Sequence, residues 1–366
     1  MLADSTISKN PDHWRLWTDG RVPADWPLIS WVAPRNMFTA DGVEHQRLRE
    51  PVKRAFSPRR VSALRPRITA IVGDLLDEVA DLAADGRPVD LKARFALPLP
   101  LRVICDLFGV PEPDRPHVQR LCDTAFDQGR AEVDHAAAFT ELRQVLGELA
   151  AAKKRSPGDD LTSRLVTDPD SSLTDDELVD TLVLLVGAGH ETTVNLITNA
   201  LRALLAHPEQ YTLLLARQLD GWWVWADLVE ETLRWASPIA ALPLRYTTVP
   251  TELCGVTVPA GEALLLCYGA ANRDPDHFGG DADRFDLTRR PAAHLAFGHG
   301  PHFCLGAPLA RLEAAIALQE LLTRFDLQPA IPPEELEPLP SLVACGVTRL
   351  PVTMSPVHRA GRKASR

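Results

Sequence analysis

Hydrophobic residues recur at spacings of three and four through most of the first two thirds of the chain, with polar residues between them. This period is typical of helices that bury one face. The clearest segments span 59–84, 117–126, 136–154 and 226–235. We therefore predict that helices dominate this part of the chain, from about residue 49 onward.

The longest predicted helix begins at Thr174. Thr174 and Glu177 have the spacing of a capping box, in which each side chain accepts a hydrogen bond from the other residue's backbone N–H. The helical pattern can continue to His207, directly before Pro208, which interrupts a helix. At 1.5 Å per residue, such a helix is roughly 50 Å long and crosses a whole domain.

The hydrophobic period changes after residue 241. Short apolar stretches alternate with polar residues and are punctuated by glycine-containing turns at Gly255 and Gly261, which predicts short antiparallel strands. These stretches are 242–249, 251–255 and 256–269. A polar coil, a glycine-rich loop and one more helix follow. The predicted fold class is mainly α with a minor antiparallel β part.

No repeat and no linker rich in Pro, Gly or Ser divides the chain. We expect a single domain over residues 1–357, followed by a short basic tail at 358–366 that is disordered. The net charge of −10 argues against general nucleic-acid binding. No apolar run approaches the length that crosses a bilayer, and the first residues lack the features of a signal peptide. We expect a cytoplasmic monomer that binds neither nucleic acid nor membrane.

The six cysteines include no C-x-x-C pair, so neither a disulfide framework nor a cysteine-rich zinc site is expected. Five of them stand in apolar surroundings and are interpreted as small buried core residues. The sixth, Cys304, stands in the ten-residue stretch FGHGPHFCLG, which spans 297–306 and leads directly into a helical pattern.

This stretch suits one sulfur ligand on a flat cofactor. A helix N-terminus favours a thiolate at Cys304, and glycines at 298, 300 and 306 let backbone approach the sulfur or the ligand closely. An axial ligand to haem iron needs these features. A zinc site of His299, His302 and Cys304 lacks a distant Cys/His pair. A cysteine nucleophile needs no glycines at these spacings, and a plain loop with a buried thiol is a further alternative.

The stretch resembles the haem-binding loop of the cytochrome P450 family, F-G-x-G-x-H-x-C-x-G, with every fixed position filled. The resemblance implies the cytochrome P450 fold and haem b (iron protoporphyrin IX) as cofactor. It implies that Cys304 is the proximal metal ligand, that Phe297 packs near it, that His302 reaches a haem propionate, and that Gly306 belongs to the cofactor-binding loop.

The long predicted helix carries the sequence AGHETT at 188–193. Ala188 and Thr192 are four residues apart and share one helix face, which suits an oxygen pocket over a flat cofactor. The nearby glycines at 187 and 189 each cost about 1 kcal/mol in a helix, which suggests a close approach or a kink. AGHETT resembles the family's oxygen-activation motif, which implies that Glu191 and Thr192 are the catalytic acid–alcohol pair that relays protons to dioxygen. A core helix that merely contains these residues is the alternative.

Further residues are assigned by the same resemblance. Glu231 and Arg234 form an E-x-x-R pair on a helix, and Arg284 is expected to complete their structural network. His45 and Arg49 resemble the family's H-x-x-x-R, which, with Arg245, implies three more cofactor-binding residues. They would pair with two buried propionates. Ala188 also belongs to the expected cofactor pocket.

The residues expected to line the substrate pocket are mostly small and apolar. Such a lining leaves room for a bulky lipophilic substrate. The expected residues of the pocket are Ala188, Thr193, Ile239, Ala240, Leu242 and Val343. We expect the segments 26–38 and 126–134 to form its lid. The sequence contains no flavin or NAD fingerprint, so electrons are expected from a ferredoxin with its ferredoxin reductase. The basic residues between Arg47 and Arg60 are a candidate docking patch for the ferredoxin, with a solvated helix face as the alternative.

The resemblance implies a haem-thiolate monooxygenase that inserts one atom of dioxygen into a lipophilic small molecule, by hydroxylation or epoxidation, such as a secondary metabolite or steroid-like compound. Oxidative coupling or peroxide-driven oxidation on the same haem is a second hypothesis. The family also has a further N-terminal helix and strands before the region where this sequence starts, so we expect these elements to be missing. A haem- or ligand-binding protein without turnover is therefore the third hypothesis.

Overall fold

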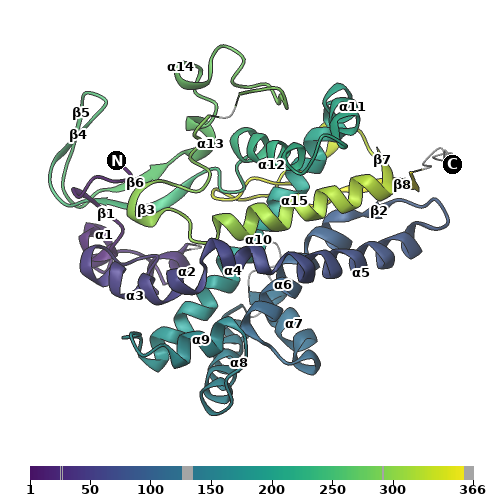
Figure 1. Cartoon of the computed structure of the whole chain (residues 1–366). Coiled ribbons are helices and arrows are strands. Elements are labelled where there is room, and N and C mark those ends of the chain that lie inside the picture. Colours follow the sequence, from purple (N-terminus) through teal and green to yellow (C-terminus); the bar gives the residue numbers. More distant parts are fainter. Residues whose placement is uncertain (25, 27, 126–134, 291, 358–366) are drawn as a thin grey trace.

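The computed structural model describes residues 1–24, 26, 28–125, 135–290 and 292–357. Helices make up most of it, and the strands lie in small antiparallel sheets beside them (Figure 1). The predicted class, mainly α with a minor antiparallel β part, is confirmed. Two predictions, the tail at 358–366 and the lid segment at 126–134, lie outside the described residues.

The α-helices of the described residues are α1 (Arg15–Thr18), α2 (Ile29–Val32), α3 (Gly42–Ala55), α4 (Pro58–Ala63), α5 (Arg65–Ala83), α6 (Pro98–Phe108), α7 (Arg115–Ala125), α8 (His135–Arg155), α9 (Leu161–Thr167), α10 (Asp175–Ala206), α11 (Pro208–Arg217), α12 (Trp223–Trp235), α13 (Tyr268–Ala271), α14 (Pro275–Phe278) and α15 (Ala307–Arg324). Short 3-10 turns are η1 (Pro11–His13), η3 (Glu112–Asp114), η4 (Gly300–His302) and η5 (Pro333–Glu335), and η2 (Lys92–Ala96) is a π-helix.

The strands form three antiparallel groups: β1 (Ile7–Ser8), β3 (Leu242–Thr247) and β6 (Ala263–Leu266); β2 (Val89–Asp90), β8 (Pro351–Pro356) and β7 (Phe325–Pro329); and the hairpin β4 (Thr251–Leu253) with β5 (Val256–Val258). In the first group the register between β3 and β6 shifts between Leu242 and Arg245, and Leu244 takes a positive φ of 75°. Such a bulge bends a strand and redirects its side chains.

Helix α10 connects two hydrophobic clusters. Its first half contributes Leu178, Leu182 and Val186 to a cluster with α6, α7, α8 and α9. Its second half contributes Ile197 and Leu201 to a cluster with α5, α12 and α15. The middle of α10, which carries AGHETT, therefore lies where the two clusters meet.

Most predicted helices are confirmed, including the capping box of Thr174 and Glu177 at the start of α10. The segment 59–84 differs, because it divides at Leu64 into α4 and α5. Pro66 occupies the first turn of α5, where its missing N–H does no harm, but it cannot continue a helix that comes from upstream. Within the described residues no helix is both long and apolar enough to cross a membrane.

Candidate active site

The loop before α15 holds the Cys304 sulfur by its backbone. The Cys304 N–H donates to the Phe297 carbonyl over 2.9 Å, and the sulfur accepts hydrogen bonds from the N–H groups of Gly306 and Ala307. Gly300 has a φ of 75°, a conformation that favours glycine, and a Cβ there would lie 3.1 Å from the Leu2 carbonyl oxygen. The loop thus orients one sulfur at the N-terminus of α15.

Opposing effects act on the Cys304 thiol. Burial raises its pKa above the ordinary value, while the two N–H donors and the guanidinium of Arg49 oppose that rise. A thiol releases its proton when it binds a metal. The same donors then stabilise the negative sulfur, and hydrogen bonds of this kind tune a bound metal.

The ring of Phe297 lies behind the loop, where the Arg311 guanidinium packs 4.5 Å from its centroid. Arg311 also donates two hydrogen bonds to Glu230, of 2.6 and 2.9 Å, and His294 lies 3.1 Å from the same carboxylate. Sequence reasoning assigned Phe297 but missed this support, because its members come from three distant segments.

The middle of α10 presents Ala188 and Thr192 on one face, as predicted. The Thr192 hydroxyl donates to the Ala188 carbonyl over 2.7 Å, and the Ala188 side chain is exposed. Thr193 departs from the prediction that it lines the pocket. It is 3% exposed and lies roughly 140° around the helix from Ala188.

Close packing against α6 accounts for the glycine at position 189 of α10. A Cβ at Gly189 would lie 3.3 Å from the Cδ1 of Ile104, so a larger residue would crowd α6. The neighbouring His190 is buried and its Nε2 lies 3.0 Å from the Leu97 carbonyl. His190 therefore fastens α10 to the N-terminus of α6.

Glu191 is half-buried on α10 and faces the π-helix η2. Burial raises the pKa of Glu191, and the positive charge of Lys92 opposes the rise. The Lys92 ammonium donates to the Val347 carbonyl over 2.6 Å. Lys92 was missed from the sequence, since a lone lysine 99 residues upstream carries no local signal.

Glu231 and Arg234 form a fully buried, two-bonded ion pair of 2.7 and 2.8 Å on α12. The remaining guanidinium donors bond to the carbonyls of Asn272, Ala282 and Arg284 over 2.6 to 3.1 Å. We call this set the ion-pair network. It ties α12 to the coil that leads to the Cys304 loop.

The predicted role of the Arg284 side chain in this network is wrong. Arg284 contributes its backbone carbonyl, and its side chain is exposed. The second guanidinium belongs to Arg289, whose Nε lies 3.6 Å from Glu231 and which also bonds Asp281. The coil turns between the two arginines, so sequence distance from Arg234 did not identify the correct one.

A second polar cluster lies beside the Cys304 loop, and we call it the propionate edge. It consists of Asp41, His45, Arg49, Arg245 and His302. The rings of His45 and His302 lie 4.0 Å apart, and the His302 Nε2 lies 3.0 Å from Asp41. Burial lowers the pKa of both imidazoles to about 4. His45 and Arg49 share a face of α3, as predicted, and Arg245 follows the bulge of β3.

Two buried nitrogens of the propionate edge have no hydrogen-bond partner among the described residues. They are the Nε2 of His45 and the Nε of Arg245, whose side chains are 3% and 4% exposed. Leaving a buried donor unpaired costs about 1–3 kcal/mol. Anionic groups at this edge would pair with the Arg245 donor and with a protonated His45 Nε2, so these residues would suit the propionates of a haem, with Cys304 as the candidate iron ligand.

Two segments of the expected pocket wall are joined by a single antiparallel β-bridge. Ile239 pairs with Ala344, and the Ala240 N–H donates to the Val343 carbonyl over 2.8 Å. Leu242 is half-buried at the start of β3. In the lid segment 26–38, the Trp31 and Phe38 rings are in edge contact at 5.9 Å. Its role as a lid stays a prediction.

The expectation that five cysteines are buried is confirmed for Cys105 and Cys122 only. Cys345 is half-buried, and Cys254 and Cys267 are exposed. Cys254 lies in the β4–β5 turn with a φ of 50°, and Cys267 directly follows β6 at the rim of its sheet. Apolar neighbours in sequence do not bury a side chain at a turn. Among the described residues no group of three or more His, Cys, Asp or Glu side chains is placed to hold a metal ion.

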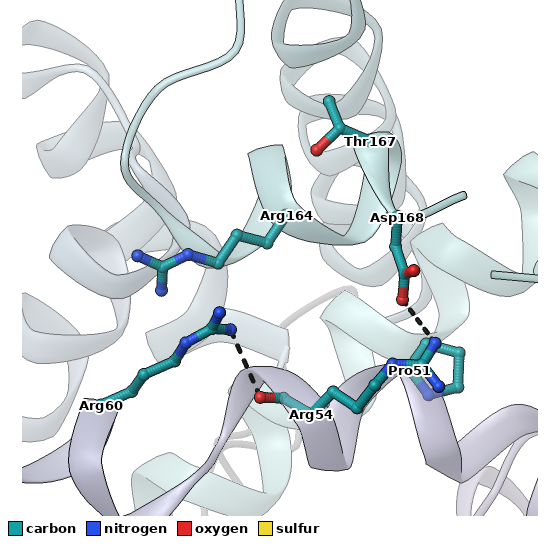
Figure 2. Close-up of a pocket in the computed structure, with 6 residues that line it drawn as sticks. All are labelled: Pro51, Arg54, Arg60, Arg164, Thr167 and Asp168. Atoms are coloured by element: carbon teal, nitrogen blue, oxygen red, sulfur yellow. Dashed lines mark hydrogen bonds and ion pairs between the residues drawn. The ribbon is translucent and has the colours of Figure 1, made fainter. Parts of the chain in front are cut away.

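A groove of about 560 Å³ runs along the outer side of the Cys304 loop. Its wall from α3 includes Arg49 and Lys53, and its wall from the loop includes Phe303. A smaller pocket of about 270 Å³ lies between α3, α4 and α9 (Figure 2). There, Arg54 donates to Asp168 and Arg60 to the Arg54 carbonyl.

The site thus combines three features. The backbone orients one sulfur, buried polar nitrogens beside it lack partners, and a helix presents a hydroxyl and a small residue. These are the features expected of a haem-thiolate protein. Comparison with known proteins agrees. The cytochrome P450 family model matches residues 226–352. The chain is 40% identical to 2-hydroxy-5-methyl-1-naphthoate 7-hydroxylase of Streptomyces carzinostaticus, over 100% of this chain and 88% of that protein.

Two further matches cover nearly the whole chain. It is 43% identical to vitamin D(3) 25-hydroxylase of Pseudonocardia autotrophica, over 97% of this chain and 85% of that protein. The solved structure of CYP154A1 from Streptomyces coelicolor A3(2) superposes with a TM-score of 0.86 at 48% identity, covering 97% of this chain and 88% of that one. The chain belongs to the cytochrome P450 family. It is a haem-dependent monooxygenase, an oxidoreductase that incorporates oxygen from O2.

Proposed function

We propose that this monooxygenase hydroxylates or epoxidises a bulky lipophilic molecule, such as a secondary metabolite or a steroid-like compound. The apolar residues Ile239, Ala240 and Val343 at the expected pocket wall support this substrate class. The two relatives named above are hydroxylases of a naphthoate and of vitamin D(3).

Cys304 is proposed as the iron ligand, and the propionate edge as the anchor of the haem. When bound, the haem supplies the site where dioxygen is reductively activated, and its thiolate ligand favours cleavage of the O–O bond. The protein orients the substrate, excludes water and moves protons. No observation favours coupling, peroxide-driven chemistry or a protein without turnover.

Proton delivery is assigned to Thr192 and Glu191. The observation that supports it best is the Thr192 hydroxyl, which bonds back to Ala188 on the open face of α10. A hydroxyl in this position can accept one proton and donate another without leaving the helix. Burial raises the pKa of Glu191, which favours the protonated form of this carboxyl relative to an exposed glutamate.

The Thr192→Ala variant tests this assignment. We expect the holoenzyme to bind haem and substrate normally. The ratio of hydrogen peroxide to product should rise roughly tenfold or more, because removal of a positioned proton donor slows proton transfer by about 10²–10⁴-fold. The measurement compares product, peroxide and oxygen consumed. Thr193→Ala is the matched control, because Thr193 is buried away from Ala188. Equal coupling in both variants and the wild type would contradict the assignment.

We propose that the electron donor is a ferredoxin, reduced by its ferredoxin reductase, that docks at the groove beside Cys304. Lys53 and Arg49 line this groove, and Arg54 and Arg60 stand close by on α3 and α4. Complementary charge speeds such encounters and makes them sensitive to salt. Reversing the charge of Lys53 and Arg54 should slow reduction several-fold at low salt. Unchanged reduction kinetics would remove this docking site.

We further propose that the chain is a single domain over 1–357 that acts as a cytoplasmic monomer. The continuous contact of α10 with both hydrophobic clusters supports one domain.

A further inference from the structure

A buried lysine stands at the propionate edge, and none of the described residues forms an ion pair with its ammonium, although the charge of Asp41 acts on it. Lys9 follows β1 and is 2% exposed. Its Nζ lies 3.5 Å from the centroid of the Phe38 ring, a cation–π contact. Asp41 accepts a hydrogen bond from the backbone N–H of Lys9, not from the ammonium. Buried charges are ordinarily paired.

The end of β1 brings Lys9 close to Arg245. Ile7 pairs with Thr247 and Ser8 with Tyr246, and Lys9 directly follows the last paired residue. The positive charge of Arg245 acts on the Lys9 amine. Repulsion from Arg245 and, above all, burial lower the pKa of the Lys9 amine well below its ordinary value. Packing the ring of Phe38 against the ammonium does not remove this repulsion.

Asp41 fastens the segment that carries Lys9. One carboxylate oxygen accepts hydrogen bonds from the Ser8 hydroxyl and from the N–H groups of Lys9 and Asn10, and the other faces His302. Although burial alone would raise the pKa of Asp41, these hydrogen bonds hold it below the usual range. Both oxygens of the Asp41 carboxylate therefore already bind other groups, and neither accepts a hydrogen bond from the Lys9 ammonium.

The charges balance when two propionates are added. Lys9, Arg49 and Arg245 bring three basic side chains to the edge, and Asp41 brings one carboxylate. Two propionates supply the two missing negative charges. Without Lys9 the same edge would carry a net negative charge once the haem is bound.

We propose that Lys9 is a further cofactor-binding residue, whose ammonium binds a haem propionate, and that Asp41 positions the segment 8–10 and His302 for this contact. The inference rests on the proposed haem site. The short strand β1 thereby closes the sheet side of the propionate edge, opposite α3.

Haem loss from the holoenzyme tests the inference. The variants are Lys9→Met and Lys9→Gln, which remove the charge, and Lys9→Arg, which keeps it. Lys154→Met removes an exposed lysine on α8 as a matched control, and Phe38→Leu removes the ring contact but keeps the ammonium. Transfer of haem to excess apomyoglobin gives the rate, the reduced CO-bound spectrum reports thiolate ligation, and a redox titration gives the midpoint potential.

We expect Lys9→Met and Lys9→Gln to lose haem roughly tenfold faster or more, the change that a lost hydrogen bond to a charged group produces. Lys9→Arg, Lys154→Met and Phe38→Leu should remain within roughly threefold of the wild type. The midpoint potential of the two neutral variants should shift to more negative values, because a nearby positive charge stabilises the reduced iron.

Two results would overturn the inference. One is haem loss from Lys9→Met within twofold of the wild type, together with an unchanged potential. The other is equal haem loss from Lys9→Met and Phe38→Leu, which would make the ring contact the whole role of Lys9. The spectrum keeps the two proposals apart. A wild type without a red-shifted CO band fails as a haem-thiolate enzyme, whereas a shifted band with unaltered haem loss defeats the Lys9 contact alone.

Discussion

The ion-pair network and the propionate edge are both buried and both polar, but they differ in how their hydrogen bonds are satisfied. The Arg234 guanidinium has five hydrogen bonds, to Glu231 and to three carbonyls. At the propionate edge, His45 and Arg245 each keep a buried nitrogen that bonds to none of the described residues. A closed network contributes to the fold, whereas an open one indicates where a ligand completes it.

The largest effect is expected from opening the closed network. Arg234→Ala leaves the Glu231 carboxylate buried without its partner, and breaking such a pair costs about 3–5 kcal/mol. We expect little folded holoenzyme at 37 °C and a large drop in the urea midpoint. Glu44→Ala is the matched control, because Glu44 and Arg47 have the same spacing on an exposed surface.

An exposed pair contributes about 0.5 kcal/mol or less, so the Glu44→Ala midpoint should barely move. An equal drop in the urea midpoint for Arg234→Ala and Glu44→Ala would contradict the comparison. It would show that a buried ion pair with all its hydrogen bonds satisfied stabilises the protein no more than an exposed pair.

A smaller and opposite effect is expected from Arg245→Leu. Without haem, this change removes an unpaired buried donor, so the haem-free protein should be as stable as the wild type or more stable. With haem, the propionate loses a charged partner, and haem affinity should fall roughly 10–100-fold. Urea unfolding of the haem-free protein and haem titration measure the two. A loss of stability in the haem-free protein with unchanged haem affinity would reverse the interpretation.

The smallest effect concerns pH. The pKa of His45 is about 4 in the folded protein without haem, against an ordinary value of 6.5. The unfolded chain therefore binds the proton first as pH falls, so the stability contribution of the neutral imidazole is full above about pH 6.5 and is lost as pH falls toward 4. Between pH 7.5 and 5.5 this is about 1 kcal/mol.

His45→Gln should remove this part of the pH dependence from urea unfolding of the haem-free protein. If the variant loses as much stability as the wild type over the same interval, His45 is not the group that titrates.

Sequence patterns predicted what is set locally. The capping box starts α10, and the FGHGPHFCLG loop leads into α15, because capping, glycine turns and helix periodicity act within a few residues. The sequence could not show that Arg289, rather than Arg284, brings its guanidinium to Glu231. That choice depends on how the coil turns about 50 residues after Arg234. Lys9 and Lys92 were missed for the same reason.

Burial was predicted less well than periodicity. Thr193 and Cys267 lie close to residues whose exposure is opposite to theirs, and only the placement of their helix or strand in the fold decides between the two. The resemblance named the residues of the site, while the structure shows which of their hydrogen bonds are already satisfied.

The central claim is that Cys304 ligates a haem iron as a thiolate. The absorption spectrum of the reduced, CO-bound protein tests it most directly, with Cys304→Ser beside Cys105→Ser as a buried cysteine away from the loop. We predict a strongly red-shifted Soret band in the wild type and in Cys105→Ser, and its loss in Cys304→Ser. A red-shifted band that persists in Cys304→Ser, or an unshifted band in the freshly prepared wild type, would contradict the account.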